Sequence, residues 1–414
     1  MAYLLGILVM VIGLVISVGL HEIGHMAPAK LFGVKVPQYF IGFGTTLWST
    51  KRGETEYGIK AIPLGGFVRL SGMFLPQPRK NRDEREVIQE AREAAAKEIE
   101  PGEESRAFYN LSVPKKLCVM FGGPVMNLII AYALMILIVV GWGLPTPSTT
   151  VSSVRECISG ESQCTEPGPA YAAGIRAGDT IIGYAGKPVN SWEEFTAAVA
   201  AQGTQPAEII YRSNGVEHRA TLTPATLTAD GKSRPVVGVT AGQERRPGTV
   251  GQAFAMTNDG LKQTAGVVLS LPQRLYDVTR SLFTSAPRED GVMSIVGVGR
   301  IAGEISSLPS HSDGTTVQGP SVGDKFMTLL SLLASLNLAL FVFNLIPLLP
   351  LDGGHIAGAL WEGLRRTVAR LRGQPDPGPA DTVRLLPLAY GVFVVLMAMT
   401  LILVVADIIK PVKL

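Results

Sequence analysis

Long apolar runs alternate with polar segments along the chain, and four of them carry no charged residue over the length that a membrane helix needs. The first covers residues 1–20 and continues toward Leu31, and the others are 117–143, 326–351 and 385–406. Because a helix rises about 1.5 Å per residue, about 20 apolar residues cross the hydrocarbon core of a bilayer. The pattern predicts an α-helical multi-pass membrane protein with four transmembrane helices.

Basic residues are concentrated in two of the polar segments between these runs. Residues 32–116 carry lysines beside both flanking spans, and the short loop 353–384 carries several arginines. Loops rich in Lys and Arg face the cytoplasm. We therefore expect a protein of the cell membrane whose N-terminus, residues 144–325 and tail 407–414 are extracytoplasmic.

Composition and cysteine content agree with this placement. The chain is 47% hydrophobic and 17% charged, and its net charge of +3 without a basic-aromatic pattern excludes nucleic acid as a partner. Cys118 begins the second span, most simply as a packing residue. Cys157 and Cys164 lie in the outer segment, where an oxidising compartment permits a disulfide that closes a short loop. Two free thiols are the alternative.

The first apolar run ends with the sequence His21-Glu22-Ile23-Gly24-His25. On a helix, residues i and i+4 share a face, so His21 and His25 can each turn an imidazole nitrogen toward one metal ion. Glu22 lies about a third of a turn from His21, where its carboxylate can take a proton from a water molecule that the metal polarises. This spacing is typical of zinc proteases with Glu as the general base. Two packed histidines and a paired glutamate are the alternative, but ionisable residues at membrane depth are costly and mark function.

A catalytic zinc site normally has three protein ligands, and Asp352 is the best third candidate. It is the first charged residue after the third apolar run. The first and third spans both run from outside to inside, so their inner ends lie at a similar depth. His355, which follows two glycines, is the alternative ligand. Asn127 and Asn344 are intramembrane amides, for which hydrogen bonding between helices and a direct role in substrate binding both remain open.

Together these motifs resemble the site-2 protease family of intramembrane zinc metalloproteases, in particular its bacterial branch with a single PDZ domain. The resemblance rests on His-Glu-x-x-His, on Gly-Pro-x-x-Asn in the second span and on Asn-x-x-Pro…Leu-Asp-Gly-Gly in the third, and it runs over nearly the whole chain. It implies that His21, His25 and Asp352 bind Zn²⁺ and that Glu22 is the catalytic base. It also implies that the substrates are single-span membrane proteins such as anti-sigma factors, cut beforehand on the outer side by another protease.

Residues 57–72 predict two short strands around a Pro-Leu-Gly-Gly turn. Helical peptide bonds are hydrogen-bonded and shielded, so a membrane-spanning substrate must become extended before it is cut. An exposed hairpin edge can hold an extended segment by strand addition, and in the family that the chain resembles the corresponding loop dips into the membrane. We therefore expect Gly65, Gly66 and Phe67 to contribute to substrate binding, with an ordinary cytoplasmic hairpin as the alternative.

The outer segment contains an ordered series of turn and strand signals between residues 151 and 224. The series comprises Gly168-Pro169, Gly174, Gly178-Asp179, Gly186 to Val189, an amphipathic helix over 191–201 and strands near 207–212 and 216–223. It resembles a PDZ domain of the protease-associated, circularly permuted kind. Such domains capture extended chains or free C-termini. The domain therefore has two possible roles: it recognises a newly cut substrate end, or it excludes uncut ectodomains by their size. We favour a filter with some peptide binding.

The remaining soluble parts carry less chemistry. Residues 83–98 predict a solvated charged helix, and 250–283 and 291–305 predict amphipathic helices along the outer membrane surface. The competing function for the whole chain is a non-catalytic PDZ membrane scaffold with a structural metal site. A structural metal site does not require a carboxylate beside its first ligand, so the presence of Glu22 favours the protease over the scaffold.

The expected order of parts is the following: 1–31 first membrane helix with the His motif, 32–116 cytoplasmic-side segment with hairpin and charged helix, 117–143 second membrane helix, 151–224 PDZ domain, 225–325 extracytoplasmic membrane-proximal linker with amphipathic helices, 326–352 third membrane helix, 353–384 cytoplasmic loop, 385–406 fourth membrane helix and 407–414 extracytoplasmic tail.

Overall fold

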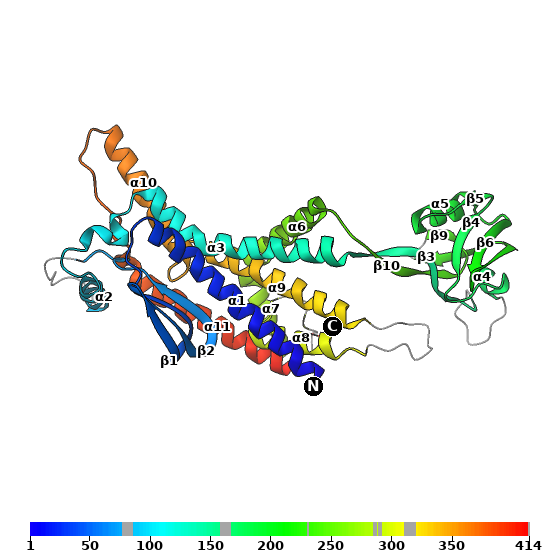
Figure 1. The fold of residues 1–414 in the computed structure, drawn as a ribbon, viewed down its shortest axis with the longest axis horizontal. Helices are drawn as coiled ribbons and strands as arrows, with labels where there is room; N and C mark the ends of the chain where they lie inside the picture. Colours follow the sequence, from blue (N-terminus) through cyan, green and yellow to red (C-terminus); the bar gives the residue numbers. More distant parts are fainter. Residues whose placement is uncertain are drawn as a thin grey trace. The chain divides into compact units, whose positions relative to one another are not determined.

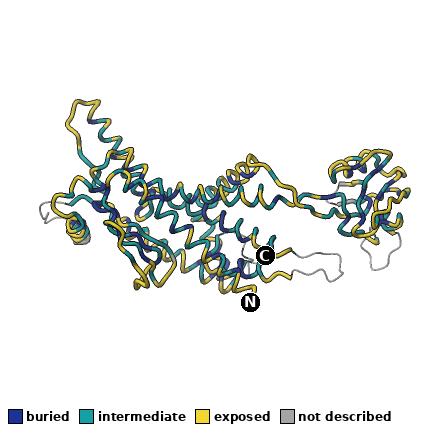
Figure 2. Tube along the Cα trace, in the orientation of Figure 1, coloured by how far each residue is buried: buried dark blue, intermediate teal, exposed yellow. Residues whose placement is uncertain are grey.

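The computed structural model describes residues 1–76, 86–157, 167–229, 232–284, 288, 292–309 and 320–412. The chain forms two compact units (Figure 1). The helical unit comprises Met1–Leu137, Gly251–Ser307 and Lys325–Leu414, and the sheet unit comprises Ile138–Val250 and Leu308–Asp324. In both units the buried residues follow the inner faces of the elements, and the exposed ones follow the loops and outer faces (Figure 2).

Four long apolar helices confirm the predicted membrane spans. They are α1 (Ala2–Leu31), α3 (Val113–Ile136), α9 (Val322–Asn344) and α11 (Leu386–Ile409). A π-helical segment, η3 (Leu137–Trp142), continues α3, and a 3₁₀ turn, η4 (Thr382–Leu385), precedes α11. All four are long and apolar enough to cross a bilayer. The chain is therefore a multi-pass membrane protein.

Glycines bring α1 and α3 into backbone contact just where α1 carries its His motif. A Cβ atom on Gly24 would overlap the carbonyl of Gly122, and one on Gly122 would overlap the carbonyl of Gly24. Helices in a membrane associate closely only where small residues remove the side-chain layer between them. Gly24, the fourth residue of the His motif, thus fixes the distance between the two helices that build the site.

Three further helices accompany the spans, and they cover the segments in which amphipathic helices were expected. They are α6 (Val250–Leu269), α7 (Leu271–Phe283) and α8 (Ile295–Ser307). Helix α8 buries Ile301 and Ala302 against Met10 of α1 and Leu333 of α9. Gly303 leaves room for the Tyr3 ring, so small residues let α8 enter the bundle. Val278 of α7 packs in the same way on α11.

The third span ends earlier than predicted, and the loop after it is largely helical. Helix α9 ends at Asn344, and α10 (Asp352–Leu371) begins with the predicted ligand. Pro347 and Pro350 lie between them, and proline cannot continue a helix because it lacks the N–H donor. Asp352 is therefore in the first turn of α10 rather than at the end of the third span, and most of the expected loop 353–384 is α10.

A buried ion pair holds α10 against α3. The Lys116 Nζ atom lies 2.7 Å from Glu362 Oε2, and both side chains are at most 5% exposed. Arg366, one turn further along α10, lies 3.0 Å from the other oxygen of Glu362. Breaking such a pair leaves a buried charge uncompensated, so the pair fixes α10, and with it Asp352, relative to α3.

Two long strands follow α1, and their pairing differs from the prediction. They are β1 (Gln38–Arg52) and β2 (Thr55–Arg69). The run Gln38–Ile41 pairs with Glu56–Ile59 on one side and with Gly66–Arg69 on the other. The two runs that flank the Pro-Leu-Gly-Gly turn therefore pair with β1 and not with each other. The run Gly66–Arg69 pairs on one side only among the described residues, which makes it an edge.

Short elements connect these strands to α3. They are α2 (Glu86–Lys97), η1 (Glu104–Arg106) and η2 (Phe108–Asn110). The described part of the predicted charged helix, from Glu86 onward, is confirmed. Arg106 lies 2.7 Å from Glu54 and Lys35 lies near Glu103, and the hydrogen bond from Lys35 lowers the pKa of the Glu103 carboxyl.

The sheet unit has a core of its own, built around Tyr184, Phe195 and Ile209. Its main sheet has the order β10-β3-β4-β6-β7, with β5 beside β4, and β8 and β9 form a separate ribbon. The helix and the two strands predicted after residue 190 are confirmed by α5, β6 and β7. The elements are β3 (Leu144–Val154), α4 (Pro169–Ala172), β4 (Thr180–Tyr184), β5 (Lys187–Pro188), α5 (Trp192–Gln202), β6 (Ala207–Ser213), β7 (Val216–Leu222), β8 (Ala225–Ala229), β9 (Lys232–Val236) and β10 (Val239–Arg246).

This unit is longer than the predicted 151–224. Strand β10 returns to pair with β3 over almost its whole length, from Val239 opposite Val154 to Arg246 opposite Leu144. Residues 225–246 therefore belong to the sheet unit and not to the linker that the sequence suggested.

Candidate metal centre

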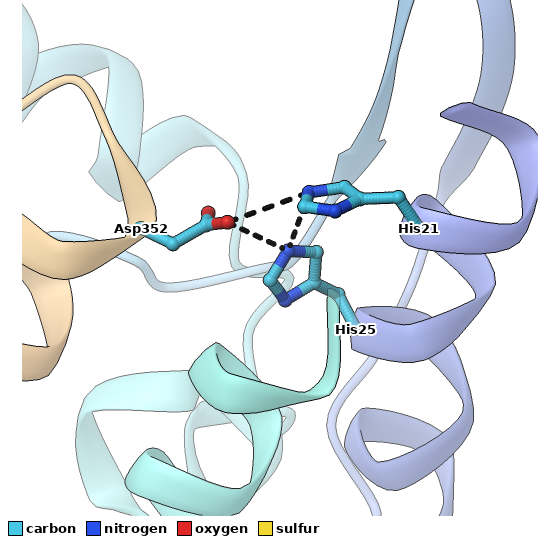
Figure 3. Close-up of side chains that lie close together, drawn as sticks. All are labelled: His21, His25 and Asp352. Atoms are coloured by element: carbon cyan, nitrogen blue, oxygen red, sulfur yellow. Dashed lines mark hydrogen bonds and ion pairs between the residues drawn. The ribbon is translucent and has the colours of Figure 1, made fainter. Parts of the chain in front are cut away.

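Three side chains from two helices converge at one point of the helical unit. His21 and His25 come from consecutive turns of α1, and Asp352 comes from the first turn of α10 (Figure 3). The two Nε2 atoms of the histidines are 3.3 Å apart. Asp352 Oδ2 lies 3.4 Å from His21 Nε2 and 3.3 Å from His25 Nε2. Among the described residues, these three are the His, Cys, Asp or Glu side chains that lie close enough together to share a metal ion.

The triangle of nitrogen and oxygen atoms has the size that zinc requires. Ligand atoms at about 2.0–2.1 Å from a tetrahedral Zn²⁺ lie about 3.3–3.4 Å from one another, which agrees with all three edges. Asp352 Oδ2 is buried and has no hydrogen-bond partner in the described part of the chain. A buried carboxylate oxygen without a donor is costly unless a cation compensates it. The donor set and its geometry therefore fit a zinc ion with one open position.

Backbone and side-chain groups of α3 orient both imidazoles. His25 Nδ1 lies 2.8 Å from the carbonyl oxygen of Val119 and donates to it, which leaves the lone pair on Nε2. On the other ring, the Asn127 amide nitrogen lies 3.1 Å from His21 Nδ1, while its Oδ1 is buried and has no hydrogen-bond partner in the described part of the chain. The positions of the nitrogen and the oxygen in an asparagine side chain are assigned from the hydrogen bonds that they form. Turned by 180°, the amide oxygen accepts from His21 Nδ1–H, and His21 Nε2 also keeps its lone pair for the metal.

We expect Asn127→Leu to weaken zinc binding about 10- to 100-fold, because an outer hydrogen bond to a ligating histidine is worth that much in affinity. Asn127→Asp keeps an oxygen acceptor at the same place and should retain most of the affinity. Competition with a chromophoric chelator in detergent measures both variants. Equal zinc affinity of Asn127→Leu and the parent would mean that the amide only joins helices or binds substrate.

Glu22 lies against the edge of the strand pair. A Cβ atom on Gly66 would lie 3.2 Å from Glu22 Cγ, so the glycine leaves just enough room for the carboxylate. Tyr39 of β1 donates its hydroxyl to the carbonyl of Gly19 at 2.8 Å and ties the strands to α1. Burial raises the pKa of Tyr39 to about 12, which keeps this donor protonated. The edge run Gly66–Arg69 is thereby held beside Glu22.

The other predicted site residues lie outside the triangle. His355 is on α10 one turn after Asp352, with its ring 6.4 Å from the Phe74 ring. Phe67 stacks on Phe40 at 5.6 Å, and Gly65 with φ of 129° lies against the Phe43 ring, so both shape the strand pair.

Asn344 is not part of the ligand triangle, and Cys164 cannot be compared with it. Asn344 is the half-buried last residue of α9. Cys164 lies outside the described residues, so its disulfide with Cys157 stays a prediction.

Sequence reasoning missed one polar contact between spans. The fully buried amide of Asn337 on α9 donates to the Ser17 hydroxyl at 3.0 Å, and Ser17 is one helical turn before His21. Both residues are isolated polar positions in apolar runs, which is the signal that could have identified them.

Comparison with known proteins identifies the family. A model of peptidase family M50 matches residues 9–375. The chain belongs to this family. The zinc metalloprotease Rip1 of Mycobacterium tuberculosis is 36% identical over 443 aligned residues that cover 100% of both chains. Zinc metalloprotease Rip1 of Mycolicibacterium smegmatis is 33% identical over 437 residues, covering 99% of both. Metalloprotease MmpA of Caulobacter vibrioides is 26% identical over 377 residues, covering 89% of this chain and 90% of its own.

The M50 peptidase is therefore a zinc metalloprotease of the site-2 protease family, which acts on membrane proteins within the bilayer. This confirms the family and the cofactor predicted from the His motif. The four apolar helices agree with a catalytic centre inside a membrane protein.

Proposed function

We propose that His21, His25 and Asp352 hold the zinc ion of this M50 peptidase and that Glu22 is its general base. The observation that carries the proposal is the triangle of Nε2, Nε2 and Oδ2 atoms, 3.3–3.4 Å on each edge, whose Asp352 oxygen has no hydrogen-bond partner among the described residues. Bound zinc supplies Lewis acidity, which polarises water and the scissile carbonyl.

The chain's own residues would perform the proton transfers. Glu22 takes a proton from the attacking water and returns it to the leaving amine, as a positioned carboxylate can. The Val119 carbonyl and the Asn127 amide hold the two imidazoles with Nε2 toward the centre. Lys116 and Glu362 keep the Asp352 helix in place. Binding, orientation and proton transfer thus come from α1, α3 and α10.

The edge run Gly66–Arg69 would hold the substrate in an extended form. It lies beside Glu22, and its other side already pairs with Gln38–Ile41. An extended segment added to this edge forms main-chain hydrogen bonds that replace those of its own helix. The apolar side chains of Leu47, Trp48 and Ile62 on the same strand pair are at least half exposed, which suits insertion into a bilayer.

We propose that the sheet unit is an extracytoplasmic PDZ domain, since the two basic segments of the helical unit favour the cytoplasm. A cleft of about 640 Å³ lies between α5 and the segment Leu227–Gln243. Phe195 and Val199 of α5 and Val237 and Val239 line it. A groove between a helix and an extended segment is where such domains take a peptide. The domain would admit trimmed substrate ends and exclude intact ectodomains.

The substrates would be single-span membrane proteins of the anti-sigma-factor kind, already cut on the outer side by another protease. The test is the purified protein in liposomes with two forms of one single-span substrate, one with its folded outer domain and one without. We expect cleavage within the span of the trimmed form alone, measured as a fragment mass. Equal cleavage of both forms would show that the sheet unit does not exclude intact ectodomains. Cleavage of neither form by the zinc-loaded protein would favour a non-catalytic scaffold.

A further inference from the structure

A second cleft lies at the end of α10 that is close to the metal centre, and the reaction does not use it. Its volume is about 600 Å³. Four segments line it: the loop after α9, the first four turns of α10, residues 377–381, and η4 with the start of α11. Gly358 of α10 abuts Thr382 of η4, where a Cβ would lie 2.8 Å from the threonine methyl group. This contact joins the two helical walls.

The inner lining is apolar and opens to the side of the bundle that faces lipid. Leu348, Leu385 and Leu388 line the cleft and are each more than one third exposed. From Leu388 the exposed apolar surface continues along α11 to Val395, which lies two turns further on the same face of the helix. Because α11 is one of the four membrane spans, the cleft is continuous with a surface that acyl chains cover.

The rim of the cleft is basic. Arg365 and Arg384 both line it. The acidic Asp381 also lines it, and its carboxylate lies 2.7 Å from Arg92 and 3.1 Å from Arg384, so two arginines share its single negative charge. The cleft therefore keeps an excess of positive charge at the point where its apolar lining ends. Trp361, 57% exposed, stands on the same rim, as aromatic residues do at the boundary of a bilayer.

We propose that this cleft binds an anionic phospholipid, with the phosphate at Arg365 and Arg384 and an acyl chain along Leu385 and Leu388. Basic pockets between membrane helices suit anionic headgroups, and the apolar lining excludes a free anion as the intended ligand. Gly354, two residues after Asp352, also lines the cleft. A bound lipid would thus pack against the first turn of α10 and steady the helix that carries the third ligand. This consequence for the metal centre rests on the proposed role of Asp352, whereas the lipid site itself does not.

Tryptophan quenching by lipids brominated in their acyl chains tests the proposal on the full-length protein. The difference between the parent and Trp361→Phe isolates the signal of Trp361. We expect brominated phosphatidylglycerol to quench Trp361 at a mole fraction on the order of tenfold lower than brominated phosphatidylcholine does, because two arginines favour the anionic headgroup. In Arg365→Gln/Arg384→Gln the ratio should fall toward one.

The matched control is Arg370→Gln/Arg372→Gln, which removes the same charge from the same segment at positions that do not line the cleft. It should keep the preference for phosphatidylglycerol. Equal quenching by both lipids in the parent, or an equal loss in both double variants, would overturn the proposal. Loss of the preference on adding millimolar inorganic phosphate would also overturn it, since the cleft would then be an anion site. Zinc content, measured on the same samples, reports separately on the metal centre.

Discussion

Glu22→Gln should lower the rate of peptide-bond cleavage about 10²- to 10⁴-fold while zinc stays bound, because general-base catalysis contributes that much. Glutamine has nearly the same size but cannot take a proton. Glu22 is not part of the ligand triangle, and its Cγ lies beside Gly66 of the edge run. Its loss should therefore leave the metal and the packing of α1 intact. Single-turnover cleavage of a trimmed single-span substrate measures the rate, and metal analysis measures the zinc.

Glu56→Gln is the matched control. Glu56 lies on β2, in the same strand pair, and pairs with Gln38. Its substitution removes a carboxylate without touching the site, so the cleavage rate should be that of the parent. Full cleavage by zinc-loaded Glu22→Gln would disprove the role of Glu22 as base. A fall in rate with a parallel loss of zinc would instead assign Glu22 to metal binding.

Local sequence patterns could predict which three side chains lie together, because each candidate ligand lies in a short motif. His21 and His25 needed only the i, i+4 geometry of a helix, and Asp352 needed only the direction of two spans. The contact of Asn127 with His21 could not be derived in this way. It depends on how α1 and α3 are aligned, which the backbone contact of Gly24 with Gly122 determines. The sequence marked Asn127 as important without specifying its partner.

The elements that prediction missed are those whose partners are distant or whose pattern is interrupted. Strand β1 contains Gly42 and Gly44 with φ of 93° and 86°, which interrupt the alternation that identifies a strand. Strand β10 pairs with β3, and the β8–β9 ribbon separates it from the rest of the sheet in sequence. Helix α10 was assigned to a loop because its arginines obscured a buried face that includes Ile356 and Ala359. Its only buried charge, Glu362, has its partner on α3.

Asp352→Ala should abolish stable zinc binding, whereas His355→Ala should leave one zinc ion per chain. Removing Asp352 leaves two protein ligands, fewer than the three of a catalytic zinc site. The His355 ring lies 6.4 Å from the Phe74 ring, and His355 is not in the ligand triangle. Zinc content after dialysis against a weak chelator measures both variants. Retained zinc in Asp352→Ala together with loss in His355→Ala would assign the third ligand to His355.

Thermal unfolding separates this ligand role from a purely structural one. Asp352 is the acidic residue in the first turn of α10, where a negative charge stabilises a helix by about 0.3–1 kcal/mol. Asp352→Ala therefore lowers the stability of the zinc-free protein as well, and absolute unfolding temperatures do not decide the question. The increase in unfolding temperature on adding zinc decides it, because a ligand that binds only the folded state stabilises that state by RT ln(1 + [L]/Kd). We expect a zinc-dependent increase in the parent and in His355→Ala, and none in Asp352→Ala. If zinc raised the unfolding temperature of Asp352→Ala as much as that of the parent, the Asp352 carboxylate would not be a zinc ligand and would act only on the helix terminus.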